Sequence, residues 1–140
     1  MARHLFQCPL RWGDMDAYGH VNNVQFIQLL EEARVAMLFI EPKASDVMTL
    51  DGQLVVVRHE IDYRAPLVYR PEPIVIETWV TRIGGASFTV AYDIKDETTT
   101  YASARTVLAA INKDTGSARR LRPDERAWIT SYYEPAGDGT

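Results

Sequence analysis

The longest helical pattern in the sequence runs from Val24 to Ile40. Apolar side chains recur there at steps of three and four residues, namely Phe26, Leu29, Leu30, Ala33, Met37 and Ile40. Asn22 is a favourable N-cap residue, and Gln25 stands three positions later, as in a capping box. The pattern predicts one long helix that begins near Asn23 and ends before Pro42.

Strand patterns occupy most of the remaining chain. Runs rich in Val, Ile, Thr, Tyr and Phe lie at Leu5–Trp12, Leu54–Ala65, Ile74–Ile83, Ser87–Lys95 and Tyr101–Asn112. Short turn-forming segments separate the last three, including Gly84-Gly85, and Asp114–Gly116 follows the final run. Consecutive strands are therefore expected to pair antiparallel.

The run from Leu54 to Arg64 shows which faces of the sheet are apolar. Strict alternation places Leu54, Val56, Arg58, Glu60, Asp62 and Arg64 on one face, and Val55, Val57, His59, Ile61 and Tyr63 on the other. The second face is the more apolar one. These elements predict an α+β domain in which about five antiparallel strands wrap around one long central helix. One helix cannot cover both faces and all edges of such a sheet, so self-association is expected.

Composition narrows the class of protein. The 140 residues are 46% apolar and 24% charged, as in a soluble globular domain, and we expect one domain over 1–134 with a flexible tail at 135–140. The net charge of −4 argues against a nucleic-acid binder. Cys8 is the single cysteine, which excludes an intrachain disulfide and favours a reducing cytoplasm. No leader and no stretch of about 18 apolar residues is found, so we expect no membrane contact.

Polar residues able to carry chemistry concentrate between the first strand and the helix. The segment Arg11–Asn23 holds Asp14, Asp16, His20 and two amides. Asp16 lies just before a helix whose first N–H groups are unsatisfied, a place that stabilises a developing oxyanion. If Asn22 caps this helix, the N–H of Asn23 is free to donate. A structural interpretation also stands, since Asx residues commonly form turns and caps in such loops.

The same segment carries a resemblance to a known family. Gly13-Asp14-Met15-Asp16, Gly19–Asn23, Phe26 and Glu31–Arg34 resemble, in order and spacing, the signature of hotdog-fold acyl-CoA thioesterases of the 4-hydroxybenzoyl-CoA thioesterase type. Val56–Pro66 is similar to the family's second strand, and Gly84–Ser87 to its hairpin and serine, so the resemblance covers residues 5–115.

The resemblance implies a single hotdog domain and gives roles to three residues. Asp16 corresponds to the catalytic carboxylate, and the backbone N–H of Asn23 to the group that polarises the thioester carbonyl. His20 matches the histidine of the similar plant acyl-carrier-protein thioesterases, although Tyr18 replaces their asparagine. His20 alternatively serves as a loop histidine bonded to backbone. Relatives share sites between subunits, which implies a homodimer or homotetramer, and no metal or redox cofactor is implied.

Residues that hold coenzyme A are less clearly marked. Arg58 and His59 lie on opposite strand faces, so one of them can face the cleft. Arg82 and Ser87 flank the hairpin that resembles the family's. An acidic protein needs a local rim of cations for the phosphates, drawn from Arg64, Arg82, Arg105, Lys113, Arg119, Arg120 and Arg122.

The sequence thus favours hydrolysis of an acyl-CoA thioester to a free carboxylic acid and CoA. Asp16 acts either as a nucleophile or as a general base on water. A hotdog hydratase or dehydratase, using Asp16 with His20 as an acid/base pair, is an alternative. A non-catalytic acyl-CoA-binding module, which keeps the motif for the helix cap alone, is another. The preferred acyl group is not encoded in any one motif.

Overall fold

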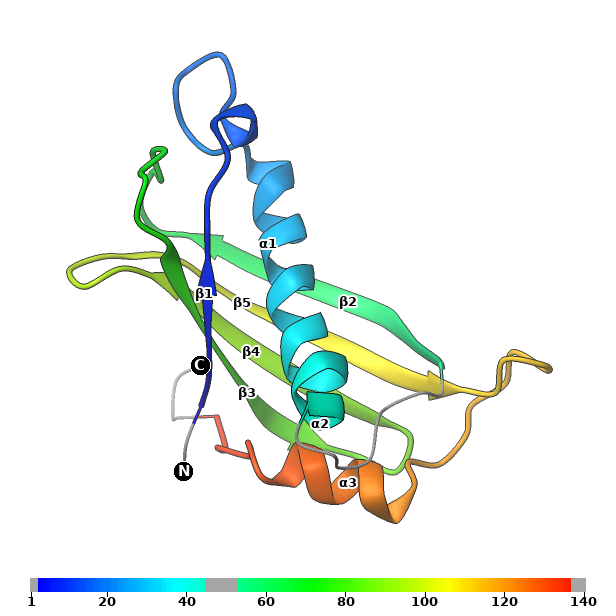
Figure 1. Ribbon diagram of the computed structural model, residues 1–140. Coiled ribbons are helices and arrows are strands. Elements are labelled where there is room, and N and C mark those ends of the chain that lie inside the picture. The colour runs from blue at the N-terminus through cyan, green and yellow to red at the C-terminus, as the bar shows by residue number, and fades with distance from the viewer. Residues whose placement is uncertain (1–2, 45–52, 137–140) are drawn as a thin grey trace.

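One long helix lies across one face of an antiparallel five-stranded sheet in the computed structural model, which describes residues 3–44 and 53–136 (Figure 1). The strand order is β1-β3-β4-β5-β2. The strands are β1 (His4–Cys8), β2 (Gln53–Tyr63), β3 (Ile74–Ile83), β4 (Ser87–Lys95) and β5 (Thr100–Ile111). The helices are α1 (Asn23–Val35), α2 (Glu41–Ala44) and α3 (Pro123–Thr130).

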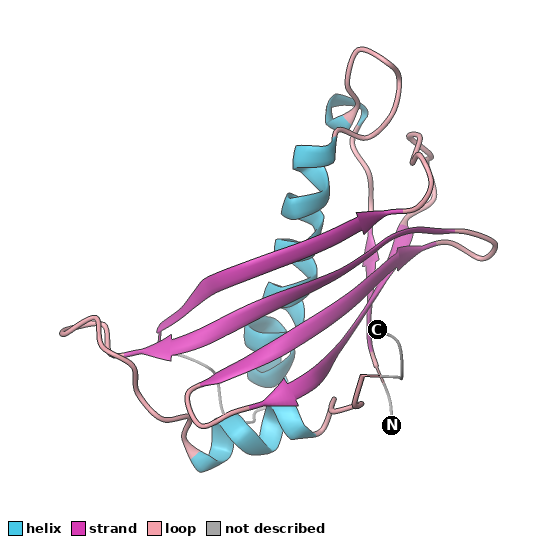
Figure 2. Ribbon diagram, turned by 180° about the vertical axis from the view of Figure 1, so that it is seen from behind, coloured by secondary structure: helices cyan, strands magenta, loops and turns pink. Residues whose placement is uncertain are grey.

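The core lies between α1 and the inner face of the sheet. Alternate side chains of β3, β4 and β5 turn toward the helix and are buried, as the period of two requires. Leu30 and Ala33 of α1 meet them and are fully buried. Figure 2 shows the opposite face of the sheet, with no described helix in front of it. The predicted arrangement, a five-stranded antiparallel sheet around one long helix, is confirmed.

The predicted start of the long helix, near Asn23, is confirmed. Helix α1 begins at Asn23, and the side chain of Asn22 accepts a hydrogen bond from the Val24 N–H at 2.9 Å. The predicted capping box with Gln25 is wrong, however. The Asn22 N–H donates instead to the carbonyl of Asp14, at 2.9 Å, so the preceding loop satisfies the group that a capping box would have used.

The predicted end of this helix is wrong. After α1, residues Ala36–Ile40 form a π turn, and α2 continues directly from Glu41 to Ala44 with Pro42 inside it. The Glu41 N–H donates to the Ala36 carbonyl five residues earlier, which is the π pattern. The turn in effect restarts the α-helix at Glu41, so Pro42 occupies a first turn, where a missing N–H costs little.

Two strands differ from their predicted patterns. Strand β1 ends at Cys8 because Pro9 follows, and Trp12–Asp14 forms a 3₁₀ turn instead of strand. In β2 the register with β5 shifts between Val56 and Arg58, a bulge at Val57. The bulge reverses the alternation, so one face carries Leu54, Val56, His59, Ile61 and Tyr63, opposite the buried residues of β5, and the outer face carries Arg58, Glu60 and Asp62. The strict alternation expected for this strand is therefore wrong beyond Val56.

Helix α3 was missed by the sequence analysis. It starts with Pro123 at its first position and two acidic residues in its first turn, both favourable helix-start signals. It closes one end of the sheet, where the Trp128 indole donates to the Met37 carbonyl at 3.0 Å and Arg126 donates to the Gly84 carbonyl at 2.9 Å. The interpretation with a single helix omitted this element because its apolar stripe spans only two turns.

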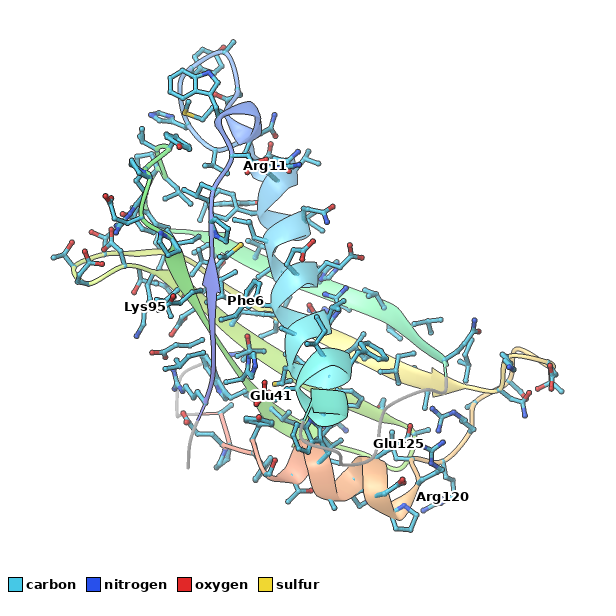
Figure 3. All side chains as sticks on the ribbon, in the orientation of Figure 1. Phe6, Arg11, Glu41, Lys95, Arg120 and Glu125 are labelled. Atoms are coloured by element: carbon cyan, nitrogen blue, oxygen red, sulfur yellow. The ribbon has the colours of Figure 1, made fainter. Side chains whose placement is uncertain are left out.

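Glu125 anchors α3 from a fully buried position (Figure 3). Its two carboxylate oxygens accept from the Arg119 guanidinium at 2.8 and 3.0 Å, and one also accepts from the Arg122 N–H at 2.8 Å. Burial alone would raise the pKa of Glu125, but these hydrogen bonds outweigh it and lower that pKa. The pair is a buried, bidentate contact that holds the C-terminal helix on the fold.

Of the predicted tail at 135–140, residues 137–140 lie outside the described residues. None of the helices described is long and apolar enough to cross a membrane.

Glu125→Ala is expected to destabilise the fold by about 3 kcal/mol, because it removes a fully buried carboxylate and the hydrogen bonds that it accepts from the Arg119 guanidinium and the Arg122 N–H. Denaturant unfolding followed by circular dichroism measures the difference. Glu97→Ala is the matched control, since this exposed carboxylate lies 3.6 Å from Arg70 and its loss should cost less than about 1 kcal/mol.

The difference between wild type and Glu125→Ala should also depend on pH. A folded-state pKa below the unfolded value stabilises the protein above about pH 4.3, and this contribution is lost as the pH falls through the folded-state pKa. The ion pair does not hold α3 if Glu125→Ala and Glu97→Ala lose the same free energy of unfolding. The same conclusion follows if the difference in free energy of unfolding between wild type and Glu125→Ala persists in acid.

Candidate active site

The loop before α1 is a tight turn that carries Asp16. Met15 and Val21 form an antiparallel bridge across it, and the Asp16 N–H donates to the His20 carbonyl at 2.8 Å. The Gly19 N–H returns to the Asp16 carbonyl at 3.1 Å, and Gly19 has a φ of 79°, in the left-handed region that favours glycine. The turn thus fixes the backbone of Asp16 and His20 side by side.

The carboxylate of Asp16 is oriented by the same turn. Its Oδ1 accepts from the Tyr18 N–H at 2.9 Å and, more weakly, from the His20 N–H at 3.4 Å. The Asx-turn interpretation of this residue is therefore correct for one oxygen. The second oxygen, Oδ2, takes no part in the hydrogen bonds described, so the structural role leaves half of the carboxylate for chemistry.

Two further contacts hold this loop on the fold. Asp14 is buried and accepts from both the backbone N–H and the guanidinium of Arg11, at 2.9 to 3.1 Å. The Val21 N–H donates to the Leu67 carbonyl at 2.7 Å, which ties the loop to the segment that follows β2. The position of Asp16 is thus set by backbone contacts on both sides.

The first amide of α1 lies next to this turn. The side chain of the N-cap residue Asn22 accepts a hydrogen bond from the Val24 N–H, and the backbone carbonyl of Asn22 accepts one from the Gln25 N–H at 2.8 Å. The Asn23 N–H, at the first helical position, is used by none of the hydrogen bonds described. A donor at the positive end of a helix dipole remains available to a ligand.

Asp16, His20 and Asn23 meet at one hollow of about 340 Å³. The other lining residues are Val21, Phe26, Tyr63, Arg64, Ala65, Pro66 and Leu67. The structure therefore brings together the three residues that the sequence predicted to be catalytic. From the segment after β2, Arg64 was expected only as a cation for the phosphates, and the other four residues, Tyr63, Ala65, Pro66 and Leu67, were missed. The turn after β2 brings this segment against the loop, and Pro66, which cannot donate to a strand ladder, was the sequence signal for such a turn.

Four of the predicted CoA-binding residues, Arg58, His59, Arg82 and Ser87, do not line this hollow in one chain. Arg58 lies on the outer face of β2 and pairs with Glu60 at 2.9 Å. Arg82 and Ser87 lie at the hairpin between β3 and β4, and this hairpin is close to α3, away from the loop of Asp16 (Figure 1). Arg64 is the one cation among the lining residues, and its Nε also donates to Ser103 at 3.0 Å.

His59 faces inward and belongs to a separate polar network. Its Nδ1 lies 2.9 Å from the Thr106 hydroxyl, which also accepts from the Tyr92 hydroxyl at 2.9 Å, and Arg34 donates to Tyr92 at 3.3 Å. Burial first, and then the nearby Arg34 charge, lower the pKa of His59. A neutral imidazole that accepts the Thr106 hydrogen at Nδ1 fits this network better than a cation for phosphate.

A second hollow, of about 540 Å³, lies on the outer face of the sheet. Its charged lining residues are Glu60, Asp62, Arg64, Asp93 and Arg105. Although it is larger, it contains neither Asp16 nor a helix start, and three carboxylates oppose an anionic ligand there. We therefore place the candidate active site in the smaller hollow.

We next consider whether the described residues include another nucleophile, such as the Cys8 thiol, or a metal site. Cys8 is buried, and burial, with smaller contributions from Glu32 and Asp14, raises the pKa of its thiol to about 11. A thiol with that pKa is not an activated nucleophile near neutral pH. The described part of the chain contains no group of three or more His, Cys, Asp or Glu residues arranged to hold a metal ion.

Comparison with known proteins defines the family. Residues 10–129 match the Thioesterase-like superfamily, so the chain belongs to it, and its sheet and central helix are the hotdog fold of such thioesterases. It is also similar to the 1,4-dihydroxy-2-naphthoyl-CoA hydrolase of Synechococcus elongatus, with 30% identity over 132 residues that cover 92% of this chain and 96% of the relative.

Solved structures agree on the fold. A predicted thioesterase from Bacillus stearothermophilus has a TM-score of 0.84 at 24% identity and covers 97% of this chain and 100% of its own. A thioesterase from Thermus thermophilus, crystallised with coenzyme A and Zn, has a TM-score of 0.75 at 23% identity and covers 91% of this chain and 92% of its own. At these identities the likeness establishes the architecture and no more.

Proposed function

We propose that this chain hydrolyses an acyl-CoA thioester to a free carboxylic acid and CoA in the hollow between the Asp16 loop and the start of α1. The observation that carries the proposal is the pairing of two groups at that hollow. Asp16 offers a carboxylate oxygen, and Asn23 offers an N–H at a helix start. An activated thioester needs little more than a carboxylate and an oxyanion donor, which lowers a barrier by several kcal/mol.

The chemistry follows one of two routes. In the first, the Asp16 carboxylate attacks the thioester carbonyl carbon, the C–S bond breaks, CoA leaves as a thiolate that takes a proton, and water hydrolyses the mixed anhydride. In the second, Asp16 removes a proton from water as that water attacks the carbonyl carbon. In both routes the negative charge on the carbonyl oxygen lies at the Asn23 N–H. His20 also lines the hollow and would orient substrate or water.

A planar aromatic acyl group is the first substrate to test. The residues that line the hollow include two aromatic ones, Phe26 and Tyr63, and the apolar residues Val21, Pro66 and Leu67. Flat rings pack favourably on such walls. The similar protein from Synechococcus elongatus is named for a naphthoyl-CoA, which supports this choice. We place the reaction in a reducing cytoplasm, consistent with a lone buried thiol at Cys8.

We further propose that the active unit is at least a homodimer, joined at the edge of β2. This strand ends the sheet and is long, and it exposes Val55, Val56 and Val57 by 38 to 63%. A long apolar edge is a template for pairing with another strand. Two copies of β2 related by a twofold axis pair antiparallel, so the end of one β2 at Tyr63 meets the beginning of the partner's β2.

That pairing explains why the predicted CoA residues lie far from Asp16 in a single chain. The start of β2 pairs with the end of β5, where Gln53 lies opposite Ile111. The start of β4 pairs with the other side of the same end of β5, where Ser87 lies opposite Ala109. A partner would therefore bring its β3–β4 hairpin, with Arg82 and Ser87, toward the site. Arg64 of the same chain would complete a cationic rim for the phosphates.

Asp16→Asn is expected to lower kcat by about 10³-fold or more, because it keeps the hydrogen-bonding shape of the turn and removes the negative charge that a nucleophile or base requires. Release of the CoA thiol from a panel of aromatic and aliphatic acyl-CoAs measures turnover. Activity within about threefold of wild type would remove Asp16 from the mechanism. In the wild type, hydration or dehydration of the acyl chain without thiol release would favour a hydratase, and binding without any turnover would favour an acyl-CoA-binding module.

Asn23→Pro and Asn23→Ala separate the backbone donor from the side chain. Proline fits the first helical position but has no N–H, so its variant should lose about 10²-fold or more in kcat, whereas alanine should keep most of the activity. Circular dichroism and molar mass need to match wild type before rates are compared. Equal rates in the two variants would place the oxyanion donor elsewhere.

Light scattering at micromolar concentration is expected to give two or four times the 15.9 kDa chain mass. Val57→Lys, on the exposed edge of β2, should shift the mass toward the monomer because charged edge residues oppose strand pairing. Val68→Lys, at a similarly exposed valine outside the strands, is the matched control and should not. A fully active wild-type monomer would contradict the shared site.

A further inference from the structure

Tyr63 joins the end of β2 to the first residue of α1. Its hydroxyl donates to the backbone carbonyl of Asn23, at 3.2 Å between the oxygen atoms. Its ring meets the ring of Phe26 edge to face, with centroids 5.3 Å apart and an interplanar angle of 88°. Both residues line the hollow that also contains Asp16. A side chain from the sheet therefore contacts the first turn of the helix at two points.

The hydroxyl contact acts on the residue that supplies the free amide. Helix starts fray, since their first residues make few backbone hydrogen bonds. The Asn23 carbonyl already belongs to the helix, so a second donor to it fixes this residue relative to β2. Strand β2 is itself held by its pairing with β5, in which Tyr63 stands opposite Ala102. The position of the Asn23 N–H is thus fixed relative to the sheet as well as to the loop.

The ring contact acts on the acyl side of the hollow. Tyr63 is half exposed although Phe26 is buried against the core, so the Tyr63 ring covers Phe26 and presents its remaining surface at the hollow. The ring contact with Phe26 and the hydroxyl contact with Asn23 together hold the Tyr63 ring in one orientation. A flat acyl group would pack against the exposed part of this ring.

We infer that Tyr63 has two separable roles: its hydroxyl positions the oxyanion amide of Asn23, and its ring selects for flat acyl groups. The inference rests on the proposed thioesterase function. Tyr63 is a positioning residue through its hydroxyl, because that group acts on the reaction only through the backbone of Asn23.

The two roles separate in kinetics. Tyr63→Phe removes the hydroxyl and keeps the ring, so kcat should fall about fivefold, the effect of one hydrogen bond, with KM unchanged within about twofold. Tyr63→Leu removes the ring as well, so KM for an aromatic acyl-CoA should rise about tenfold while KM for acetyl-CoA changes less than about twofold. Tyr133→Phe, which removes a phenol hydroxyl from the C-terminal segment outside the hollow, is the matched control and should behave as wild type.

A thermal melt of each variant distinguishes positioning from simple support of the fold. If Tyr63 only stabilises the structure, Tyr63→Phe lowers the melting temperature but leaves kcat at 25 °C equal to that of Tyr133→Phe, and the positioning role is overturned. An equal rise of KM for both acyl-CoAs in Tyr63→Leu overturns the selective role. A wild type that releases no CoA from any substrate overturns the proposed function itself, and the inference with it. Turnover that Asp16→Asn abolishes but Tyr63→Phe leaves intact refutes the positioning role and leaves the proposed function standing.

Discussion

The first turn of α1 is the constraint on which the rest of the site depends. A helix start leaves N–H groups without intrahelical acceptors, and each must find another partner or stay open. Here the Asn22 side chain accepts a hydrogen bond from the Val24 N–H, and the Asn22 N–H donates to the Asp14 carbonyl in the loop. One amide, that of Asn23, is left toward the hollow. The same loop turns back on itself at Gly19 and presents Asp16 beside that amide.

The sheet supports this arrangement from the other side. The bulge at Val57 shifts the alternation of β2, and this shift places Tyr63 on the inner face, toward the start of the helix. Without the bulge, the strict alternation from Leu54 would put Tyr63 on the opposite face. The residues after β2 then bond to the loop through Leu67 and Val21. A local irregularity in one edge strand thereby determines which side chains reach the site.

Local sequence signals predicted those parts of the fold that local physics controls. The helix start at Asn23 follows from capping preferences, and β3 and β4 follow from dense β-branched runs between turn residues. The helix end, the bulge and α3 were not predicted. Pro42 follows a π turn that restarts the helix. The bulge at Val57 is defined only by the register of β2 against β5, and α3 is short, with its buried Glu125 bonded to Arg119. For the site, the loop motif indicated Asp16, His20 and Asn23, whereas Tyr63 reaches the hollow only through the bulge in β2 and its contacts with α1.

The most direct test of this account is a crystal structure of the Asp16→Asn variant with an intact aromatic acyl-CoA. The account predicts that the thioester oxygen lies about 3 Å from the Asn23 amide nitrogen, within hydrogen-bond range, and that the carboxamide at position 16 lies about 3 to 3.5 Å from the carbonyl carbon or from one ordered water that contacts it. A thioester bound in the hollow on the outer face of the sheet, or one whose carbonyl oxygen points away from Asn23, would contradict it.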